Sequence, residues 1–265
     1  MSSIHRLWKE NLVNSNLRST KPRVNGCTMV LDKGLGLGAF RDLLKIAGEY
    51  IDFIKLGFGT AGITPPELLR EKIALANQYE VGIYPGGTFL EIAWFRKEHH
   101  HYFETVSSLG IKWLEISDGI IELSLSERAS LIRQAQEMGF GIITEIGKKS
   151  AGSALDIEAF MRIYEHDLDL GARYIIVEGR ESGKNIGIYD EKGQIHIPCL
   201  KAILHQTDPE TIIWEAPQTS QQIELLRLIG PKVNLGNISP QEILSLECLR
   251  RGLRADTFPL ADFCK

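Results

Sequence analysis

The sequence is poor in cysteine, and its cysteines form no familiar metal-binding pattern. The four of them are scattered along the chain without a Cys-x-x-Cys pair, which argues against a zinc site and favours reduced thiols. No apolar run reaches the roughly 18 residues of a membrane-spanning helix. The opening segment, MSSIHRLWKENLVNSN, lacks the apolar stretch of a signal peptide. We therefore expect a cytoplasmic protein that does not enter a membrane.

A strong charge of either sign is also missing. The net charge is −4, from 30 basic and 34 acidic residues, so nothing favours nucleic acid or an anionic membrane as a partner. No linker or low-complexity segment divides the 265 residues, although this length would also allow two smaller domains. It is close to the roughly 250 residues of one (β/α)8 barrel. We predict a barrel domain over residues 21–265, preceded by an N-terminal extension over residues 1–20.

Eight short apolar segments, many of them ended by a glycine or a charged residue, have the composition of buried parallel strands. Their starts are roughly 22 to 37 residues apart, the length of one strand-and-helix unit. The segments are residues 28–32, 53–57, 81–85, 113–117, 141–146, 174–178, 211–215 and 233–235. Eight such units favour an α/β fold that closes into a single-domain (β/α)8 TIM barrel, with an open doubly wound sheet as the alternative.

Helix signals lie between these segments. Four patterns of a hydroxyl residue followed three residues later by Glu or Gln predict capping boxes. They begin at Thr64, Ser124, Thr219 and Ser239. Pro65 and Pro240 are predicted at first helical positions, where the missing N–H costs nothing. Four glycines, Gly110, Gly139, Gly171 and Gly230, occupy positions typical of residues just beyond a helix end.

Charged residues gather where the predicted strands end, which in a barrel is the catalytic face. Glu115, Glu145, Glu178 and Glu215 each follow several apolar strand residues. Carboxylates at that depth are costly unless they are paired or bind a metal, so we predict a functional cluster. Its carboxylates suit a hard cation such as Mg²⁺. Basic residues that suit phosphate or carboxylate lie at the same ends; they are Lys33, Lys55, Lys148, Lys149 and Arg180.

Loops beyond the strands add to this picture. Gly236 and Asn237 precede a predicted capped helix in the last unit, the frequent phosphate site of such barrels. The long loop over residues 183–197, with a turn at residues 190–193, is expected to border the active site. The glycine pattern at residues 34–38 is GxGxG and predicts a flexible loop more strongly than a nucleotide site. Three adjacent histidines at residues 99–101 predict an exposed helix, because neighbouring side chains point different ways.

The strings that carry this pattern closely resemble the phosphosulfolactate synthase family over about residues 21–258. They are 21–23 (KPR), 28–34 (TMVLDKG), 50–60 (YIDFIKLGFGT), 84–88 (YPGGT), 115–119 (EISDG), 144–149 (TEIGKK), 178–183 (EGRESG), 215–217 (EAP), 233–238 (VNLGNI) and 249–258. The resemblance implies a barrel that adds sulfite to phosphoenolpyruvate with Mg²⁺, giving (2R)-phospho-3-sulfolactate for sulfolactate or coenzyme M synthesis. The family's proposed acid/base lysine corresponds to Lys149.

On this basis we assign roles as hypotheses. Lys149, with Lys148 beside it, is the candidate proton donor. The expected Mg²⁺ ligands are Glu145, Glu178 and Glu215, and the expected substrate-binding residues are Lys33, Lys55, Arg180, Gly236 and Asn237. Two alternatives remain at this point. One is another barrel lyase that acts on a phosphorylated acid, and the other is a non-catalytic heat-tolerance or interaction protein, as plant relatives suggest. We also expect self-association, which is common for barrels of this size.

Overall fold

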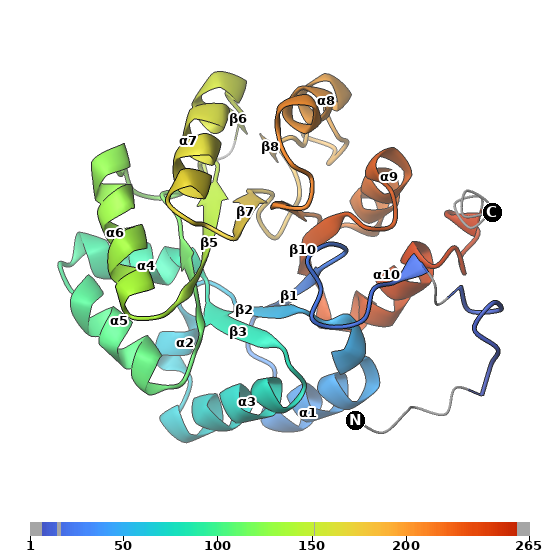
Figure 1. Ribbon diagram of the computed structural model, residues 1–265, viewed down its shortest axis with the longest axis horizontal. Coiled ribbons are helices and arrows are strands. Elements are labelled where there is room, and N and C mark those ends of the chain that lie inside the picture. Colours follow the sequence, from blue (N-terminus) through green and yellow to red (C-terminus); the bar gives the residue numbers. More distant parts are fainter. Residues whose placement is uncertain (1–6, 15–16, 151, 259–265) are drawn as a thin grey trace.

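The computed structural model describes residues 7–14, 17–150 and 152–258 (Figure 1). The described residues leave out parts of the predicted N-terminal extension and the last seven residues, which include Cys264. Eight parallel strands form one sheet in the order β3-β2-β1-β10-β9-β7-β5-β4. The outermost strands of this order, β3 and β4, lie side by side, so the sheet curls into a nearly closed barrel. The predicted (β/α)8 TIM barrel is confirmed.

Each of the eight predicted strand segments overlaps a strand of the barrel. The strands are β1 (Thr28–Asp32), β2 (Phe53–Leu56), β3 (Gly82–Pro85), β4 (Trp113–Ile116), β5 (Gly141–Ile146), β7 (Tyr174–Val177), β9 (Ile212–Glu215) and β10 (Asn234–Ile238). The last strand runs three residues further than predicted, because Gly236 pairs with Glu215 of β9 and Ile238 pairs with Val30 of β1. The strands are rich in branched aliphatic side chains that are buried on both faces, as parallel strands between two packed layers must be.

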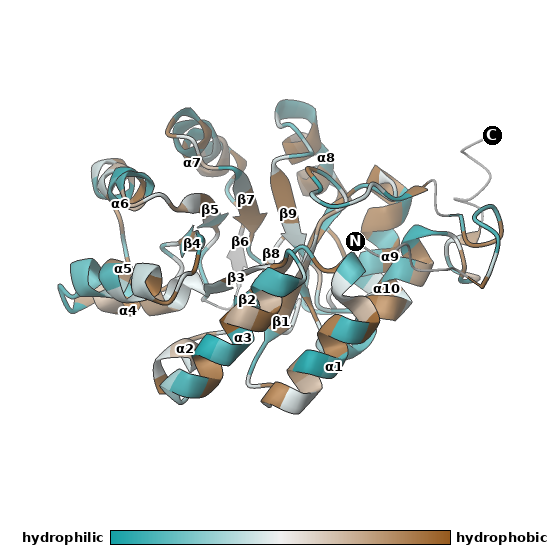
Figure 2. Ribbon diagram, turned by 60° about the horizontal axis from the view of Figure 1, so that its bottom comes forward, coloured by the Kyte–Doolittle hydropathy of each residue, from teal (hydrophilic) through white to brown (hydrophobic). Residues whose placement is uncertain are grey.

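Helices surround the barrel. The α-helices are α1 (Leu37–Ala47), α2 (Thr60–Ile63), α3 (Pro66–Gln78), α4 (Gly87–Phe95), α5 (His99–Ser108), α6 (Leu125–Glu137), α7 (Ile157–Asp169), α8 (Ile197–Gln206), α9 (Thr219–Ile229) and α10 (Ile243–Arg250). Short 3₁₀ turns, η2 (Gly48–Tyr50) and η3 (Pro240–Glu242), precede β2 and α10. Figure 2 shows hydrophilic residues along the outer helices and hydrophobic colour on β9 in the centre. Among the described residues, none of the helices combines the length and the apolarity needed to cross a membrane.

The helix-start predictions were only partly right. The box at Ser124 is confirmed, since its N–H donates to Glu127 and its hydroxyl accepts from the Glu127 N–H. The box at Thr219 is wrong, because its hydroxyl donates to Glu242 instead. The boxes at Thr64 and Ser239 are also wrong. Their hydroxyls donate to the Thr60 carbonyl and to the Gln241 side chain.

Two prolines and four glycines were predicted at the ends of helices. Helix α3 begins at Pro66, so Pro65 caps it and does not occupy the first helical position. Pro240 does begin its element, although that element is the 3₁₀ turn η3. The four predicted glycines at helix ends all have positive φ, as that position requires. The histidines at residues 99–101 begin α5, where the second and third are exposed, as predicted.

The barrel has an apolar floor and a charged upper face. Phe53, Trp113 and Tyr174 begin β2, β4 and β7, and their rings meet edge to face inside the barrel, with Phe53 5.1 and 5.6 Å from the other two ring centres. Side chains of a strand alternate between its two faces, so the residue two positions further along also points inward. For β2 and β4 that residue is Lys55 and Glu115. The same alternation that places the aromatic floor therefore places charges above it.

Candidate active site

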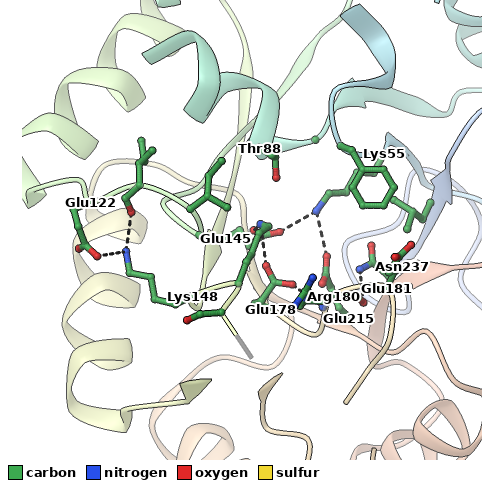
Figure 3. Close-up of a pocket in the computed structure, with 18 residues that line it drawn as sticks. Lys55, Thr88, Glu122, Glu145, Lys148, Glu178, Arg180, Glu181, Glu215 and Asn237 are labelled. Carbon is green, nitrogen blue, oxygen red and sulfur yellow. Dashed lines mark hydrogen bonds and ion pairs between the residues drawn. The ribbon is translucent and has the colours of Figure 1, made fainter. Parts of the chain in front are cut away.

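A pocket of about 680 Å³ opens at the carboxyl ends of the strands (Figure 3). Of the residues that were assigned a role from the sequence, it brings together all except Lys33 and Gly236. The predicted residues that line it are Lys55, Glu145, Lys148, Lys149, Glu178, Arg180, Glu215 and Asn237. They come from five of the strands or from the loops that follow them, so separate parts of the chain meet at one place.

The deepest layer of the pocket is a group of buried ion pairs, which we call the inner cluster. Its members are Lys55, Glu115, Glu145, Lys149, Glu178 and Glu215. The Lys55 ammonium lies 2.9 Å from a carboxylate oxygen of Glu115, 2.9 Å from Glu145 and 3.2 Å from Glu215. Burial alone would lower the pKa of Lys55, but these three carboxylates raise it well above its ordinary value. Lys55 is therefore a permanent cation that ties three strands together.

Lys149 is the second cation of the inner cluster. Its ammonium contacts Glu145, which lies four residues earlier in the chain, at the end of β5. It also lies 2.9 Å from an oxygen of Glu178. Burial would lower its pKa, but the two carboxylates raise it above the ordinary lysine value. The side chain keeps 19% of its surface exposed, toward the pocket. Lys149 thus carries a proton that is both strongly held and accessible to a ligand.

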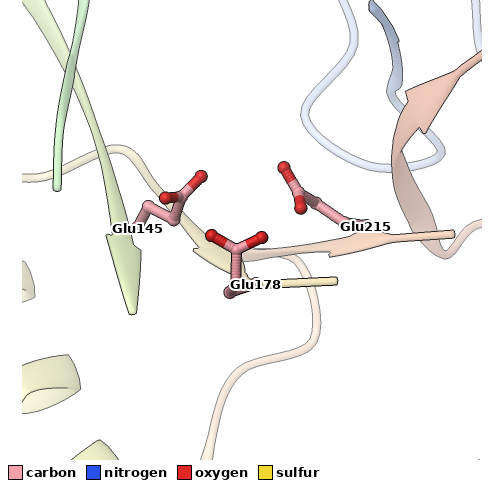
Figure 4. Close-up of side chains that lie close together, drawn as sticks. All are labelled: Glu145, Glu178 and Glu215. Carbon is pink, nitrogen blue, oxygen red and sulfur yellow. The ribbon is translucent and has the colours of Figure 1, made fainter. Parts of the chain in front are cut away.

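Three carboxylates of the inner cluster converge on a common space. Glu145, Glu178 and Glu215 each offer one oxygen, and these oxygens all lie within 4.8 Å of one another (Figure 4). Their other contacts orient them: Glu215 accepts a hydrogen bond from the Gly179 N–H at 2.9 Å, and Glu178 accepts one from the Arg180 N–H at 2.6 Å. Converging carboxylates at the bottom of a pocket are the ligands that Mg²⁺ uses together with water and substrate oxygens.

The charge of the inner cluster fits a divalent cation. With every group ionised, its four carboxylates and two ammonium groups leave a surplus of two negative charges. Burial, with Glu145 and Glu215 nearby, raises the pKa of Glu178 to about 9. Burial and Glu145 likewise raise the pKa of Glu115 to about 7, against the pull of Lys55. Protonation is one way to relieve such a surplus, and a bound Mg²⁺ is another.

Lys148 and Lys149 are neighbours in the chain but point to different places. The Lys148 ammonium donates to the backbone oxygens of Asp118 at 2.7 Å and Ile121 at 2.9 Å, and it pairs with the Asp118 carboxylate at 3.0 Å. Figure 3 shows it beside Glu122 at the pocket wall. Of the two predicted catalytic lysines, Lys149 is the one that the structure places in the inner cluster.

The opposite side of the pocket carries the groups that suit an anion. Arg180 and Asn237 both have left-handed backbone conformations, with φ of 57° and 54°, and the Asn237 amide donates to the Arg180 carbonyl at 3.0 Å. Non-glycine residues held at such φ values are typical of functional sites. The side-chain oxygen Oδ1 of Asn237 is buried and has no hydrogen-bond partner within the described part of the chain. An acceptor is thus left for a ligand or a water molecule.

Lys33 lies in an adjoining pocket of about 430 Å³ that shares Asn237 and Glu181 with the first. Its ammonium pairs with Glu181 at 3.2 Å, and both side chains are about half exposed. The structure therefore places Lys33 at the rim of the site, next to the inner pocket and not in it.

Gly236 is not brought to the pocket. A β-carbon there would lie 2.5 Å from the Met29 methyl and 3.0 Å from Ile213, so this glycine allows close packing inside the barrel. The predicted capped helix directly after Asn237 is also absent from this part of the described chain, because β10 continues to Ile238 and a 3₁₀ turn follows. The backbone N–H groups of an α-helix are therefore not available directly after Asn237 to bind a phosphate.

The long loop after β7 is more ordered than a simple connection. Its strand β8 (Ile186–Gly187) pairs with β6 (Ser153–Ala154) in a small second sheet, and the predicted turn forms at Asp190, whose carbonyl accepts from the Gly193 N–H at 2.9 Å. The Gln221 side chain donates to the carbonyls of Gly183 and Gly193. These contacts hold the loop over one side of the barrel top.

The sequence and the fold are similar to those of known proteins. A family model described as (2R)-phospho-3-sulfolactate synthase (ComA) matches residues 16–256. The phosphosulfolactate synthase of Methanothermobacter thermautotrophicus is 46% identical over 91% of this chain and 94% of that protein. That of Methanocaldococcus jannaschii is 42% identical over 88% and 94%. Among solved structures, 3-hexulose-6-phosphate synthase from Salmonella typhimurium shares the fold, with a TM-score of 0.54 at 15% identity over 89% of this chain and 95% of that one.

Proposed function

The chain belongs to the phosphosulfolactate synthase family, and from this premise we propose that it adds sulfite to phosphoenolpyruvate with the help of Mg²⁺, giving (2R)-phospho-3-sulfolactate. This product would serve sulfolactate or coenzyme M biosynthesis. The observation that carries the proposal is the inner cluster. Three converging carboxylates lie beside the Lys149 ammonium, which is largely buried but accessible from the pocket. Arg180 and Lys33, which we call the cationic rim, lie at the edge of the site. These groups are of the kinds that would bind a metal, donate a proton and bind an anionic substrate.

The metal would be held by Glu145, Glu178 and Glu215, whose surplus negative charge it would cancel. When bound, Mg²⁺ supplies a Lewis acid that stabilises the negative charge developing on the substrate carboxylate. The Lys55 ammonium keeps Glu145 and Glu215 in place from below. Because Lys55 already contacts three carboxylates, we infer that it organises the ligands and is not free to bind the substrate's anionic groups.

Lys149 is the proposed general acid. Sulfite attacks C3 of phosphoenolpyruvate, so a C–S bond forms while the electron pair of the C2=C3 bond moves to C2 and into the carboxylate. A proton must then reach C2, and the Lys149 ammonium is the group that holds one at the pocket surface. The Lys149 ammonium is protonated at neutral pH, as a general acid must be before it donates. Water returns the proton to Lys149 after the product leaves.

The cationic rim is the proposed site for the substrate's phosphate. Arg180 is an exposed residue that lines the pocket, and its guanidinium is suited to two-point contact; Lys33 lies at the adjoining rim. Asn237 positions Arg180 through its hydrogen bond to the Arg180 carbonyl. The negative inner cluster and the positive rim thereby give the substrate one orientation, with its carboxylate toward the metal and its phosphate outward.

The test is a direct assay. Purified protein is incubated with phosphoenolpyruvate, sulfite and Mg²⁺, and the product is detected by mass spectrometry. We expect phosphosulfolactate, and we expect its formation to stop when Mg²⁺ is chelated and to resume when Mg²⁺ is restored. Folded, metal-loaded protein that forms no product would overturn the proposal and favour a non-catalytic role. Covalent trapping of the substrate by borohydride would instead indicate a Schiff-base barrel lyase.

A further inference from the structure

We propose that Glu91 is a positioning residue of this active site: it fixes the loop over residues 117–122, which in turn holds Lys148 and the backbone of Lys149. Glu91 belongs to α4 and does not line the pocket of the inner cluster. Its role would therefore be exerted through the loop and not through contact with a substrate. The catalytic consequence rests on the function proposed above, whereas the structural consequence does not.

The Glu91 carboxylate is buried, with 1% of the residue exposed, and each of its oxygens is used. One oxygen accepts a hydrogen bond from the Ser117 hydroxyl. The other accepts from two consecutive backbone N–H groups, those of Ile120 at 2.6 Å and Ile121 at 3.2 Å. A side chain from one βα unit thus holds the loop of the next unit at three points, and a carboxylate is the group that can accept all three.

The held loop supplies the contacts of the two lysines. Lys148 is held by the backbone oxygens of Asp118 and Ile121 and by the Asp118 carboxylate. The Lys149 N–H donates to the Gly119 carbonyl at 3.0 Å. A β-carbon on Gly119 would lie 2.8 Å from the Lys149 side chain, so the lysine stem runs directly against the loop. A shift of this loop would therefore move both lysines.

The helix that carries Glu91 is itself tied to the inner cluster. The Gly87 N–H, at the start of α4, donates to Glu115 at 2.7 Å. A β-carbon on Gly87 would collide with the Ser117 hydroxyl, which shows how closely α4 meets the end of β4. Glu91 follows one helical turn later. The position of its carboxylate is thus fixed relative to Glu115, the member of the inner cluster that pairs with Lys55.

The test uses the Glu91→Gln variant of the full chain, which keeps the side-chain size but replaces one acceptor oxygen by a donor. The matched control is Glu247→Gln. Glu247 is also a buried carboxylate, and it accepts from Arg18 and Arg251 at a site away from this loop. Hydrogen exchange over residues 117–124, thermal unfolding, kcat and the KM for phosphoenolpyruvate are measured for both variants and for the wild type.

For Glu91→Gln we expect exchange of the Ile120 and Ile121 amides to accelerate at least about tenfold. We expect kcat to fall about 10- to 100-fold while KM changes by less than about threefold, because a displaced proton donor costs rate more than binding. Glu247→Gln should lose thermal stability but keep wild-type exchange in this loop and wild-type kcat. If Glu91→Gln fails to fold, Ser117→Ala removes one of the three contacts and should change both quantities in the same direction by less.

Two results would overturn the inference: unchanged exchange at Ile120 and Ile121 in a folded Glu91 variant, or a kcat that falls equally in the Glu247 control. If the wild-type protein forms no phosphosulfolactate at all, the proposed function fails instead. The exchange measurement then still decides whether Glu91 fixes the loop.

Discussion

Replacing Lys149 by methionine removes the ammonium group that contacts both Glu145 and Glu178. Breaking a buried ion pair by removing one partner costs about 3–5 kcal/mol. The cost here should lie near the low end, about 3 kcal/mol, because the pKa of Glu178 is already raised to about 9 by burial and by its acidic neighbours. Glu178 is therefore largely protonated at pH 7, and Glu145 keeps its ion pair with Lys55, so little uncompensated charge remains buried.

The same variant should lose far more activity than stability. Removing a general acid lowers kcat by about 10² to 10⁴, and the assay is phosphosulfolactate formation from saturating phosphoenolpyruvate, sulfite and Mg²⁺. Lys148→Met is the matched control, since the Lys148 ammonium lies on the loop at residues 117–122 and pairs with Glu122, which is outside the inner cluster. It should reduce kcat less than Lys149→Met does. Near wild-type turnover by folded Lys149→Met would refute the assignment of the proton donor.

Three further results are expected. Mg²⁺ at about 100 times its dissociation constant should stabilise the protein by about 2.7 kcal/mol, which raises the unfolding midpoint by roughly 5–10 °C. Calorimetry of Glu178→Gln should show that most of this stabilisation by Mg²⁺ is lost. Gly87→Ala should lower stability by about 1–3 kcal/mol, because its methyl group would collide with the Ser117 hydroxyl, and chemical denaturation measures this. Burial raises the pKa of the Cys27 thiol to about 12. The stability that this thiol contributes is therefore present below about pH 9, where the unfolded thiol ionises, and is lost as the pH rises toward the folded pKa. In Cys27→Ala, the free energy of unfolding should fall less between about pH 9 and pH 12 than in the wild type.

Much of the site could be predicted from the sequence because strands impose a simple geometry. A glutamate that follows several apolar strand residues must lie near the top of a barrel strand, and parallel strands bring all such ends to one face. Glu145, Glu178 and Glu215 follow this rule, and the structure brings their oxygens together. The strand segments were predictable for the same reason, since their apolar runs are buried from both sides.

What the sequence could not show depends on side-chain direction and on contacts between distant units. Lys148 and Lys149 are adjacent and chemically alike, and only the folded loop decides which of them reaches the inner cluster. Gly236 sits in the expected loop region but faces the barrel interior, because the last strand is longer than its apolar run. Glu91 lies in the middle of a helix, where a carboxylate is usually solvated, so no local pattern indicates its contacts with the next unit.

The most direct test of the central claim is the mass of the product formed in ²H₂O from phosphoenolpyruvate, sulfite and Mg²⁺. Addition of sulfite at C3 with delivery of a proton from exchangeable Lys149 predicts phosphosulfolactate that carries one deuterium, located at C2. No sulfur-containing product, or a product whose deuterium is missing or lies at C3, would contradict the account.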